Sequence, residues 1–228
     1  MTDFFPFPDT PYLAWLGPSQ LREEKVLDAR QVREFLSRDV FIEEEVDGPN
    51  LGLSVDDKGV LLAQNRGKHV KLDAPARHWK PLKRWLSNRK QALVETLAPG
   101  LILFGEWRYA AHSVHYTRLP DWFLAFGVYR RSQREFLGVE RRNAVVSSIE
   151  RRVVPALGHA RFDLEGVKAL MAHSCLTDGP PDGVYVRREA DGHRIERTKL
   201  VRPELVQAIG EDWSKRNLEE NQLMRTGP

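Results

Sequence analysis

Three strand-like runs near the start of the chain are separated by short turn sequences. The runs read VFIEEEV at residues 40–46, LGLSVD at 51–56 and VLLAQN at 60–65, and the turns between them read DGPN and DKG. Turn residues between short apolar runs are typical of antiparallel strands joined by tight connections. This stretch predicts an antiparallel meander, and it restricts the fold to classes that contain antiparallel sheet.

The remaining sequence mixes helices and strands without strict alternation. Helical spacing of apolar residues predicts helices, while dense aromatic and aliphatic runs predict two buried strands and a hairpin around the turn ADGH. The expected helices cover residues 28–38, 74–97 (the longest), 139–152, 163–174 and 203–224, and the expected strands cover 101–110, 121–131, 182–189 and 194–201. This order of elements indicates an α+β fold.

Length and composition favour a single folded unit. The chain has 228 residues, 41% of them hydrophobic, which is enough to bury a sizeable core. It contains no repeat of fixed period and no linker longer than a loop. We therefore expect one domain over residues 1–228, in which residues 1–20, rich in proline and aromatics, form an extended arm.

Charge and cysteine content limit the cellular setting. Lys and Arg outnumber Asp and Glu by only 35 to 32, so net charge alone does not indicate a nucleic-acid partner. Basic stretches such as KPLKRWLSNRK suit a phosphate-binding groove, although solvated helix faces look the same. A single cysteine, Cys175, excludes an internal disulfide, and the sequence shows neither a signal peptide nor a membrane span. These features predict a cytoplasmic protein with no membrane partner.

Several common catalytic signatures are absent from the sequence. It has no G-x-x-x-x-G-K phosphate loop and no G-x-S-x-G nucleophile elbow, so P-loop nucleotidase and serine hydrolase readings lack support. His112 and His115 lie close in sequence without a third ligand nearby, and this spacing does not indicate zinc.

Six short motifs follow one another in a defined order. They read EVDG at residues 45–48, QNRG around Arg66, LFGEW around Glu106, FLAFGVY at 123–129, DGVYVR from Asp182 and RTKLVRPE from Arg197. Their order and spacing resemble the RNA ligase branch of the covalent nucleotidyltransferases, the superfamily of ATP-dependent RNA and DNA ligases and messenger-RNA capping enzymes. The resemblance implies an ATP-grasp-like nucleotidyltransferase domain of antiparallel sheets flanked by helices.

The first motif departs from this family at its central residue. The family motif is Lys-x-Asp-Gly, whose lysine attacks the α-phosphate of ATP, and Glu45 stands in the lysine position while Asp47 and Gly48 are kept. A desolvated neutral amine is a good nucleophile. A carboxylate brings negative charge towards the triphosphate, and any acyl phosphate would hydrolyse readily. The resemblance therefore implies a nucleotide site that does not adenylylate itself. Without the resemblance, VDGPN is an ordinary hairpin-turn sequence.

The later motifs keep some family residues and change others. Arg66 matches an arginine near the reacting ends, Glu106 a glutamate facing the ribose, and Phe126 the aromatic that stacks on adenine. Gly127 stands where the family usually has Asp, and Asp182 replaces a glutamate, which shortens the reach of a carboxylate expected to hold a metal. Without the resemblance, Phe126 is a core aromatic by default, and Glu106 a buried acid paired with Arg108 or Lys199.

The last motif completes the implied site. Arg197 takes the first of two lysine positions, and Lys199 keeps the second. With Glu45, these residues are implied to form the catalytic group. ATP or AMP with Mg²⁺ or Mn²⁺ is the implied cofactor set, and RNA is the implied partner beside the nucleotide.

Three functions remain open at this point. The chain could bind nucleotide and RNA ends without self-adenylylation, or it could seal RNA ends that are already adenylylated, since that step does not use the motif lysine as nucleophile. In the third reading it is a structural or interaction protein, in which Glu45 pairs with Lys199 or Arg197 and fills the former phosphate site.

Overall fold

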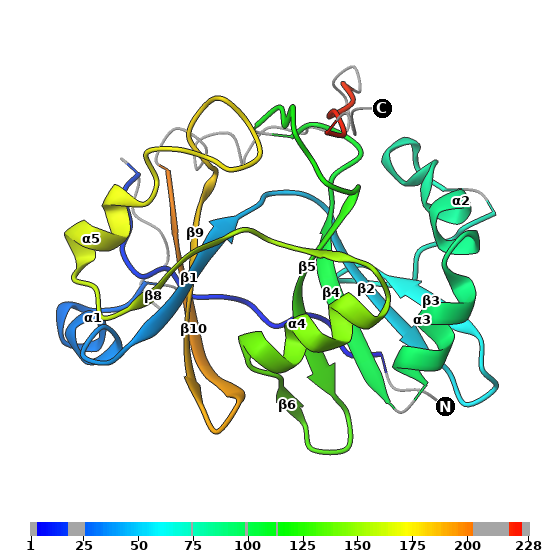
Figure 1. Ribbon diagram of the computed structural model, residues 1–228, viewed down its shortest axis with the longest axis horizontal. Helices are drawn as coiled ribbons and strands as arrows, with labels where there is room; N and C mark the ends of the chain where they lie inside the picture. Colours follow the sequence, from blue (N-terminus) through cyan, green and yellow to red (C-terminus); the bar gives the residue numbers. More distant parts are fainter. Residues whose placement is uncertain are drawn as a thin grey trace.

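The computed structural model consists of two antiparallel sheets that lie side by side, with helices on their outer faces (Figure 1). It describes residues 4–17, 26–73, 75–98, 100–112, 114–202 and 219–224. The predicted α+β class of antiparallel sheets flanked by helices is confirmed.

The four-stranded sheet has the order β10-β9-β1-β8 and is antiparallel throughout. Its β9–β10 pair is the hairpin predicted around the ADGH turn, in which Asp191 and Gly192 both have positive φ. Its strands are β1 (Val40–Glu45), β8 (Ala156–Ala160), β9 (Gly183–Ala190) and β10 (His193–Val201). Strand β8 was not predicted, because its ALGHA sequence is half exposed and lacks a regular apolar alternation.

The six-stranded sheet has the order β3-β2-β4-β5-β6, and β7 pairs in parallel with β5. Apart from the two-residue strands β6 and β7, its members match the predicted runs. The strands are β2 (Asn50–Val55), β3 (Leu61–Gln64), β4 (Leu101–Trp107), β5 (Phe123–Arg130), β6 (Glu135–Phe136) and β7 (Arg152–Val153).

The predicted three-strand meander is wrong in one respect. Strand β1 does not pair with β2, because the chain leaves the four-stranded sheet at Glu45 and enters the six-stranded sheet at Asn50. DGPN is therefore a crossover between sheets and not a hairpin turn. This crossover places the EVDG motif at the junction of the two sheets.

The helices are shorter than the sequence pattern indicated. The long helix expected over residues 74–97 is broken into a 3-10 turn and two short helices, because Pro81 cannot donate a backbone hydrogen bond and Arg89 leaves helical dihedral angles. The helices are α1 (Ala29–Phe35), the 3-10 turn η2 (Arg77–Trp79), α2 (Leu82–Ser87), α3 (Lys90–Leu97), α4 (Val139–Ser148) and α5 (Leu164–Ala169).

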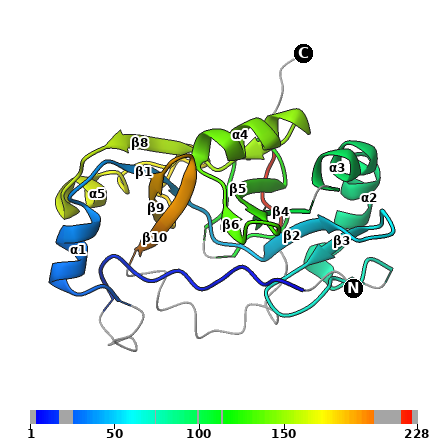
Figure 2. The ribbon, with the colours of Figure 1, turned by 90° about the horizontal axis from the view of Figure 1, so that it is seen from below.

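Three apolar clusters hold these layers together. One packs helices α2, α3 and α4 on the six-stranded sheet, and another packs α1 and α5 on the four-stranded sheet. The third lies on the opposite face of the six-stranded sheet and includes Phe7 from the N-terminal segment. Residues 4–13 run as an extended segment along both sheets, on the side away from α4 (Figure 2).

Two further expectations concern the chain ends and the membrane. Most of the helix predicted over 203–224 lies outside the described residues; within it, residues 219–224 form isolated bridges with Ala110 and Leu119. None of the helices in the described part is long and apolar enough to cross a membrane. The assignment of residues 1–228 to a single domain stays a prediction.

Candidate functional site

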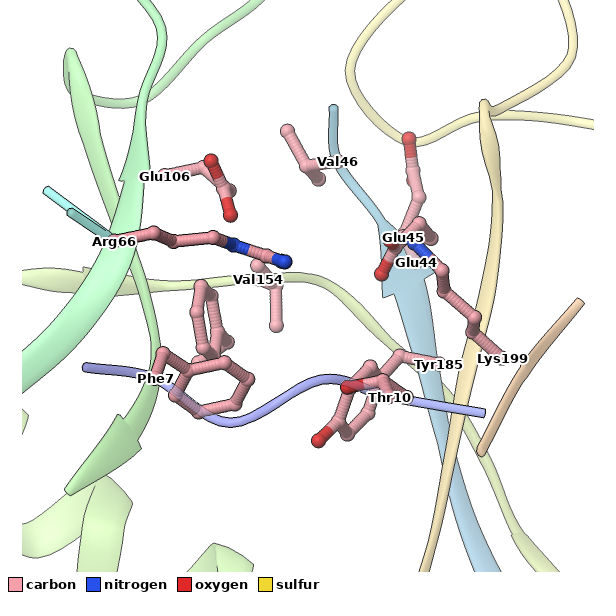
Figure 3. Close-up of a pocket in the computed structure, with 11 residues that line it drawn as sticks. Phe7, Thr10, Glu44, Glu45, Val46, Arg66, Glu106, Val154, Tyr185 and Lys199 are labelled. Atoms are coloured by element: carbon pink, nitrogen blue, oxygen red, sulfur yellow. Dashed lines mark hydrogen bonds and ion pairs between the residues drawn. The ribbon is translucent and has the colours of Figure 1, made fainter. Parts of the chain in front are cut away.

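A small pocket lies at the junction of the two sheets, where β1 ends (Figure 3). Both sheets and the N-terminal segment contribute to its wall. The residues that line it are Phe7, Thr10, Glu44, Glu45, Val46, Arg66, Glu106, Phe126, Val154, Tyr185 and Lys199. Five residues predicted from five separate motifs therefore meet here: Glu45, Arg66, Glu106, Phe126 and Lys199.

Glu45 and Lys199 form an ion pair across the four-stranded sheet. Lys199 Nζ donates to Glu45 Oε1 at 3.1 Å, and each side chain is 21% exposed. Burial, the largest influence, lowers the pKa of Lys199, but the Glu45 carboxylate and Tyr12 outweigh it, so the net pKa is raised. Lys199 is therefore a protonated ammonium at neutral pH, and it neutralises the carboxylate beside it.

Asp47 and Gly48 lie in the crossover beside the pocket, close to Asp182. The Asp47 backbone N–H donates to Asp182 Oδ2 at 3.2 Å, and the same oxygen accepts from the Tyr116 hydroxyl. A Cβ atom on Gly48 would lie 2.6 Å from Arg108 Nη1, so this position has no room for a side chain. The two motifs are thereby fixed against each other through Asp182.

Glu106 faces the pocket from β4. Its Oε1 is 3.5 Å from Asn50 Nδ2, while its Oε2 is buried without a hydrogen-bond partner. Burial, followed by repulsion from Glu45 and Asp47, raises the pKa of Glu106 well above its usual value, and Arg66 only partly opposes this. The ion pair with Lys199 that the sequence allowed is not formed, because Lys199 pairs with Glu45.

The two arginines of the predicted site contact the N-terminal segment. Arg66 Nη1 lies 3.3 Å from Asp9 Oδ1 in an exposed ion pair. The Arg197 guanidinium donates to Thr10 Oγ1 at 2.9 Å and to the carbonyls of Pro8 and Asp9, each at 2.8 Å. Arg197 does not line the pocket, and of the two basic partners that the sequence allowed for Glu45, Lys199 is the one that pairs with it.

Phe126 lies on β5 with 9% of its surface exposed. Its ring meets Phe7 edge-on, with centroids 4.8 Å apart. At the neighbouring Gly127, a Cβ atom would contact Phe136 and Phe7 at 3.6–3.7 Å, which are ordinary van der Waals distances. Space alone does not require a glycine at this position.

The two glutamates before Glu45 have structural partners. Glu43 Oε1 accepts from Arg142 Nη2 at 2.6 Å, and its other oxygen accepts from Arg142 and Arg187. Both arginines also donate to the carbonyl of Phe126, at 3.2 and 3.0 Å. This buried network ties β1 to β5 under the pocket. Sequence reasoning missed it, although two acids inside an apolar strand signal a need for buried cations.

Glu44 is held differently from Glu43. Its Oε1 accepts from the Ser174 hydroxyl and its Oε2 from the Cys175 backbone N–H at 2.9 Å. Burial raises the pKa of Glu44, and these two hydrogen bonds act in the opposite direction. The three consecutive glutamates therefore have three separate functions in the fold.

Among the described residues, the site offers an unpaired hydrogen-bond acceptor but no cluster of metal ligands. No group of three or more His, Cys, Asp or Glu side chains in the described part could hold a metal ion. Asp182, predicted as a metal ligand, already accepts hydrogen bonds from Tyr116 and Asp47. The orphaned Glu106 Oε2, by contrast, suits a ligand hydroxyl donor.

Sequence reasoning also missed the pocket residues Phe7, Thr10 and Tyr185. The FFPFPDTPY stretch indicated an extended arm, but no pattern in it specified where the arm would dock. Tyr185 lies inside β9, two residues after Gly183, which pairs with Glu45. It belongs to the DGVYVR motif, in which the sequence interpretation considered only Asp182.

Comparison with known families gives one match over most of the chain. Residues 38–201 match the family model described as RNA ligase. No curated protein sequence matches the chain.

Solved structures with a similar fold include several of the Naegleria gruberi RNA ligase. A lysine-to-alanine mutant with ATP and Mn has a TM-score of 0.65 and 18% identity, covering 88% of this chain and 57% of that one. The same ligase with PPi has a TM-score of 0.62 and 18% identity, with 90% and 63% coverage. A glutamate-to-alanine mutant with AMP and Mn has a TM-score of 0.63 and 16% identity, with 89% and 57% coverage. The present chain spans less than two thirds of these relatives' length.

Proposed function

Since the chain belongs to the RNA ligase family, we propose that it binds ATP or AMP between its two sheets without forming a covalent nucleotide adduct. RNA ends are the proposed second ligand. Solved structures of the Naegleria gruberi RNA ligase, whose fold is similar, contain ATP or AMP with Mn, which supports the choice of ligand.

The Glu45–Lys199 ion pair carries this proposal. Adduct formation needs a neutral amine that can attack the α-phosphate. Among the described residues that line the pocket, Lys199 has the one amine, and its raised pKa keeps it protonated beside Glu45. Glu45 itself offers a carboxylate, whose acyl phosphate product would be lost to water. Neither side chain supplies a stable nucleophilic attachment point.

The other pocket residues support non-covalent binding. The Phe126 ring offers an aromatic surface for the base, and the unpaired Glu106 Oε2 can accept a hydrogen bond from a ribose hydroxyl. Arg66 and Lys199 supply positive charge for phosphates. A bound Mg²⁺ or Mn²⁺ would neutralise phosphate charge, and it would depend on the phosphates for most of its ligands.

One observation favours a second candidate, a structural or interaction protein that has lost the nucleotide. The pocket has a volume of about 30 Å³, while small-molecule sites usually measure roughly 300–1,000 Å³. The remaining candidate, sealing of pre-adenylylated RNA ends, depends on Arg66, Glu106, Asp182 and Lys199, of which all but Asp182 line the pocket.

The test combines thermal melting with label transfer from α-labelled ATP in Mg²⁺ or Mn²⁺. Millimolar ATP should raise the melting temperature of the unmodified protein, because a ligand that binds only the folded state stabilises it. No label should remain on the protein after denaturing electrophoresis. In Glu45→Lys, the introduced amine would lie beside the Lys199 cation, which lowers the pKa of the introduced amine and favours its attack on the α-phosphate of ATP. This variant should become labelled.

Glu45→Gln is the matched control, since it removes the carboxylate charge without adding an amine. It should bind ATP and stay unlabelled. Label on the unmodified protein would contradict the proposal, and so would the absence of any ATP-dependent stabilisation in all three proteins. Joining of pre-adenylylated RNA by the unmodified protein would establish the sealing function.

We also propose that the protein acts in the cytoplasm. The free thiol of Cys175 is exposed, which suits a reducing compartment.

A further inference from the structure

The N-terminal segment of residues 4–13, called the strap below, spans both sheets at the pocket (Figure 2). At one end, Gln64 Nε2 at the end of β3 donates to the Phe5 carbonyl at 2.7 Å. At the other end, the Leu13 N–H donates to the Lys199 carbonyl at 2.7 Å, and the Lys199 N–H donates to the Pro11 carbonyl at 3.0 Å. The strap is thus anchored on each side of the pocket and crosses it in between (Figure 3).

Phe7 fills the space where the strap crosses. It is 5% exposed, and its ring lies edge-on against Phe126 at 4.8 Å and against Phe104 at 5.2 Å. The Arg197 guanidinium lies 4.8 Å from the centre of the same ring. Phe7 therefore covers the Phe126 ring, the aromatic surface proposed for the base, and packs against the Arg197 guanidinium.

The strap also engages both arginines of the predicted site. Arg197 donates three hydrogen bonds to strap residues 8–10, and Arg66 pairs with Asp9. A phosphate group would compete directly for these guanidinium groups, because it is a stronger acceptor than a backbone carbonyl.

With the strap docked, the pocket leaves little room for a nucleotide. Its volume is about 30 Å³, against roughly 300–1,000 Å³ for usual small-molecule sites. Within the four-stranded sheet, β1, β9 and β10 are joined by antiparallel ladders with one register shift, between Arg194 and Glu196. These strands are therefore poor candidates for movement. Residues 6–10 of the strap form no such ladder. Pro6 and Pro8 lack a backbone N–H, and the Pro8 and Asp9 carbonyls accept hydrogen bonds from the Arg197 side chain instead of from a neighbouring strand.

We propose that the strap is an autoinhibitory gate: docked, it closes the nucleotide pocket with Phe7 as the plug, and nucleotide binds to the undocked state. This inference rests on the proposed nucleotide binding. The apparent affinity for ATP is then reduced by the fraction of molecules whose strap is docked. Any partner or substitution that releases the strap raises that affinity.

The experiment measures ATP·Mg²⁺ affinity by equilibrium dialysis for the full chain and three variants. Phe7→Ala removes the plug and should bind ATP at least tenfold more tightly than the unmodified protein. Asp9→Asn frees Arg66 from an exposed residue, which keeps the fold intact, and should bind several-fold more tightly. Phe41→Ala removes an aromatic ring that stacks on His159 away from the pocket, and its affinity should stay within twofold of the unmodified value.

Hydrogen exchange gives an independent readout of strap release. Saturating ATP should speed exchange of the Leu13 amide, whose hydrogen bond to Lys199 fixes the strap, and should slow exchange in the pocket strands. If the unmodified protein binds ATP and both Phe7→Ala and Asp9→Asn bind it equally or more weakly, the gate proposal is wrong while the proposed function stands. Phe7 would then be a residue that contacts the bound nucleotide. If neither the unmodified protein nor any strap variant binds ATP, the proposed function fails together with the gate.

Discussion

Arg142 Nη2 lies 2.6 Å from Glu43 Oε1, and the two side chains are 1% and 2% exposed. Arg187 shares the same carboxylate, and both arginines donate to the Phe126 carbonyl. A single acid therefore compensates two buried cations and ties β1 to β5. Burial lowers the pKa of Arg142, and the Glu43 carboxylate opposes that effect.

Glu43→Gln should be severely destabilising. It removes the carboxylate charge that bonds two buried guanidinium groups, and removing one partner of a buried ion pair typically costs about 3–5 kcal/mol. Urea unfolding of the purified variant measures this loss. Glu165→Gln is the control, since its ion pair with Lys168 is exposed; equal stability losses in the two variants would contradict the inferred role of Glu43.

The Glu45–Lys199 pair should show measurable coupling in a double-mutant cycle. With Glu45→Gln, Lys199→Met and the double variant, we expect a coupling free energy of about 1–3 kcal/mol, as for contacting, partly desolvated charges. The exposed Glu165–Lys168 pair should give only about 0.2–0.5 kcal/mol. A coupling of that smaller size at Glu45–Lys199 would mean that solvent screens this pair as it screens the surface pair.

The same pair predicts a pH dependence. The folded-state pKa of Lys199 is raised above its usual 10.5, so its stabilising contribution is complete below that value and is lost as pH rises through the folded pKa. The gap in melting temperature between the unmodified protein and Lys199→Met should therefore be constant from pH 7 to 9 and narrow at higher pH. A gap that narrows below pH 9 would contradict the raised pKa.

Gly48→Ala should destabilise the fold by about 1–3 kcal/mol, the usual cost of overpacking. The added Cβ would lie 2.6 Å from Arg108 Nη1 and 3.2 Å from the Trp107 carbonyl, and the backbone atom cannot swing away. Gly179→Ala is matched in chemistry, and its Cβ would meet nothing within 4 Å. Denaturant midpoints of the two variants measure the difference; equal midpoints would show that the Arg108 side chain moves freely.

The sequence predicted the strands better than their pairing in the sheets. Short runs such as 123–129 are apolar and aromatic, so local propensity and burial agree on a strand. The pairing of β1 with β8 and β9 depends on contacts more than one hundred residues apart in the sequence. The DGPN sequence is typical of a tight hairpin turn and so predicted that β1 pairs with β2. The same residue types also suit a crossover between sheets, so the local sequence did not distinguish the two.

Side-chain partners were less accessible to sequence reasoning. Lys199 was correctly named as a possible partner of Glu45, since opposite charges within one family site tend to meet. The docking of Phe7 against Phe126 depends on how the strap folds back across both sheets. No local periodicity in residues 4–13 encodes that path, so only the structure reveals where the strap docks.

Glu106 should make the protein less stable as pH rises, and Glu106→Gln should remove that effect. Burial and the neighbouring acids Glu45 and Asp47 raise its folded-state pKa well above 4.5. The folded protein therefore binds the proton more tightly than the unfolded chain, so the stability from this group is complete below pH 4.5 and is lost as pH rises through the folded pKa. Thermal melts of both proteins from pH 4.5 to 8 should show Glu106→Gln gaining on the unmodified protein as pH rises. Glu165→Gln, which alters an exposed acid, should show no such gain; a Glu106→Gln difference that is flat with pH would mean that Glu106 ionises normally, with its Oε2 oxygen solvated.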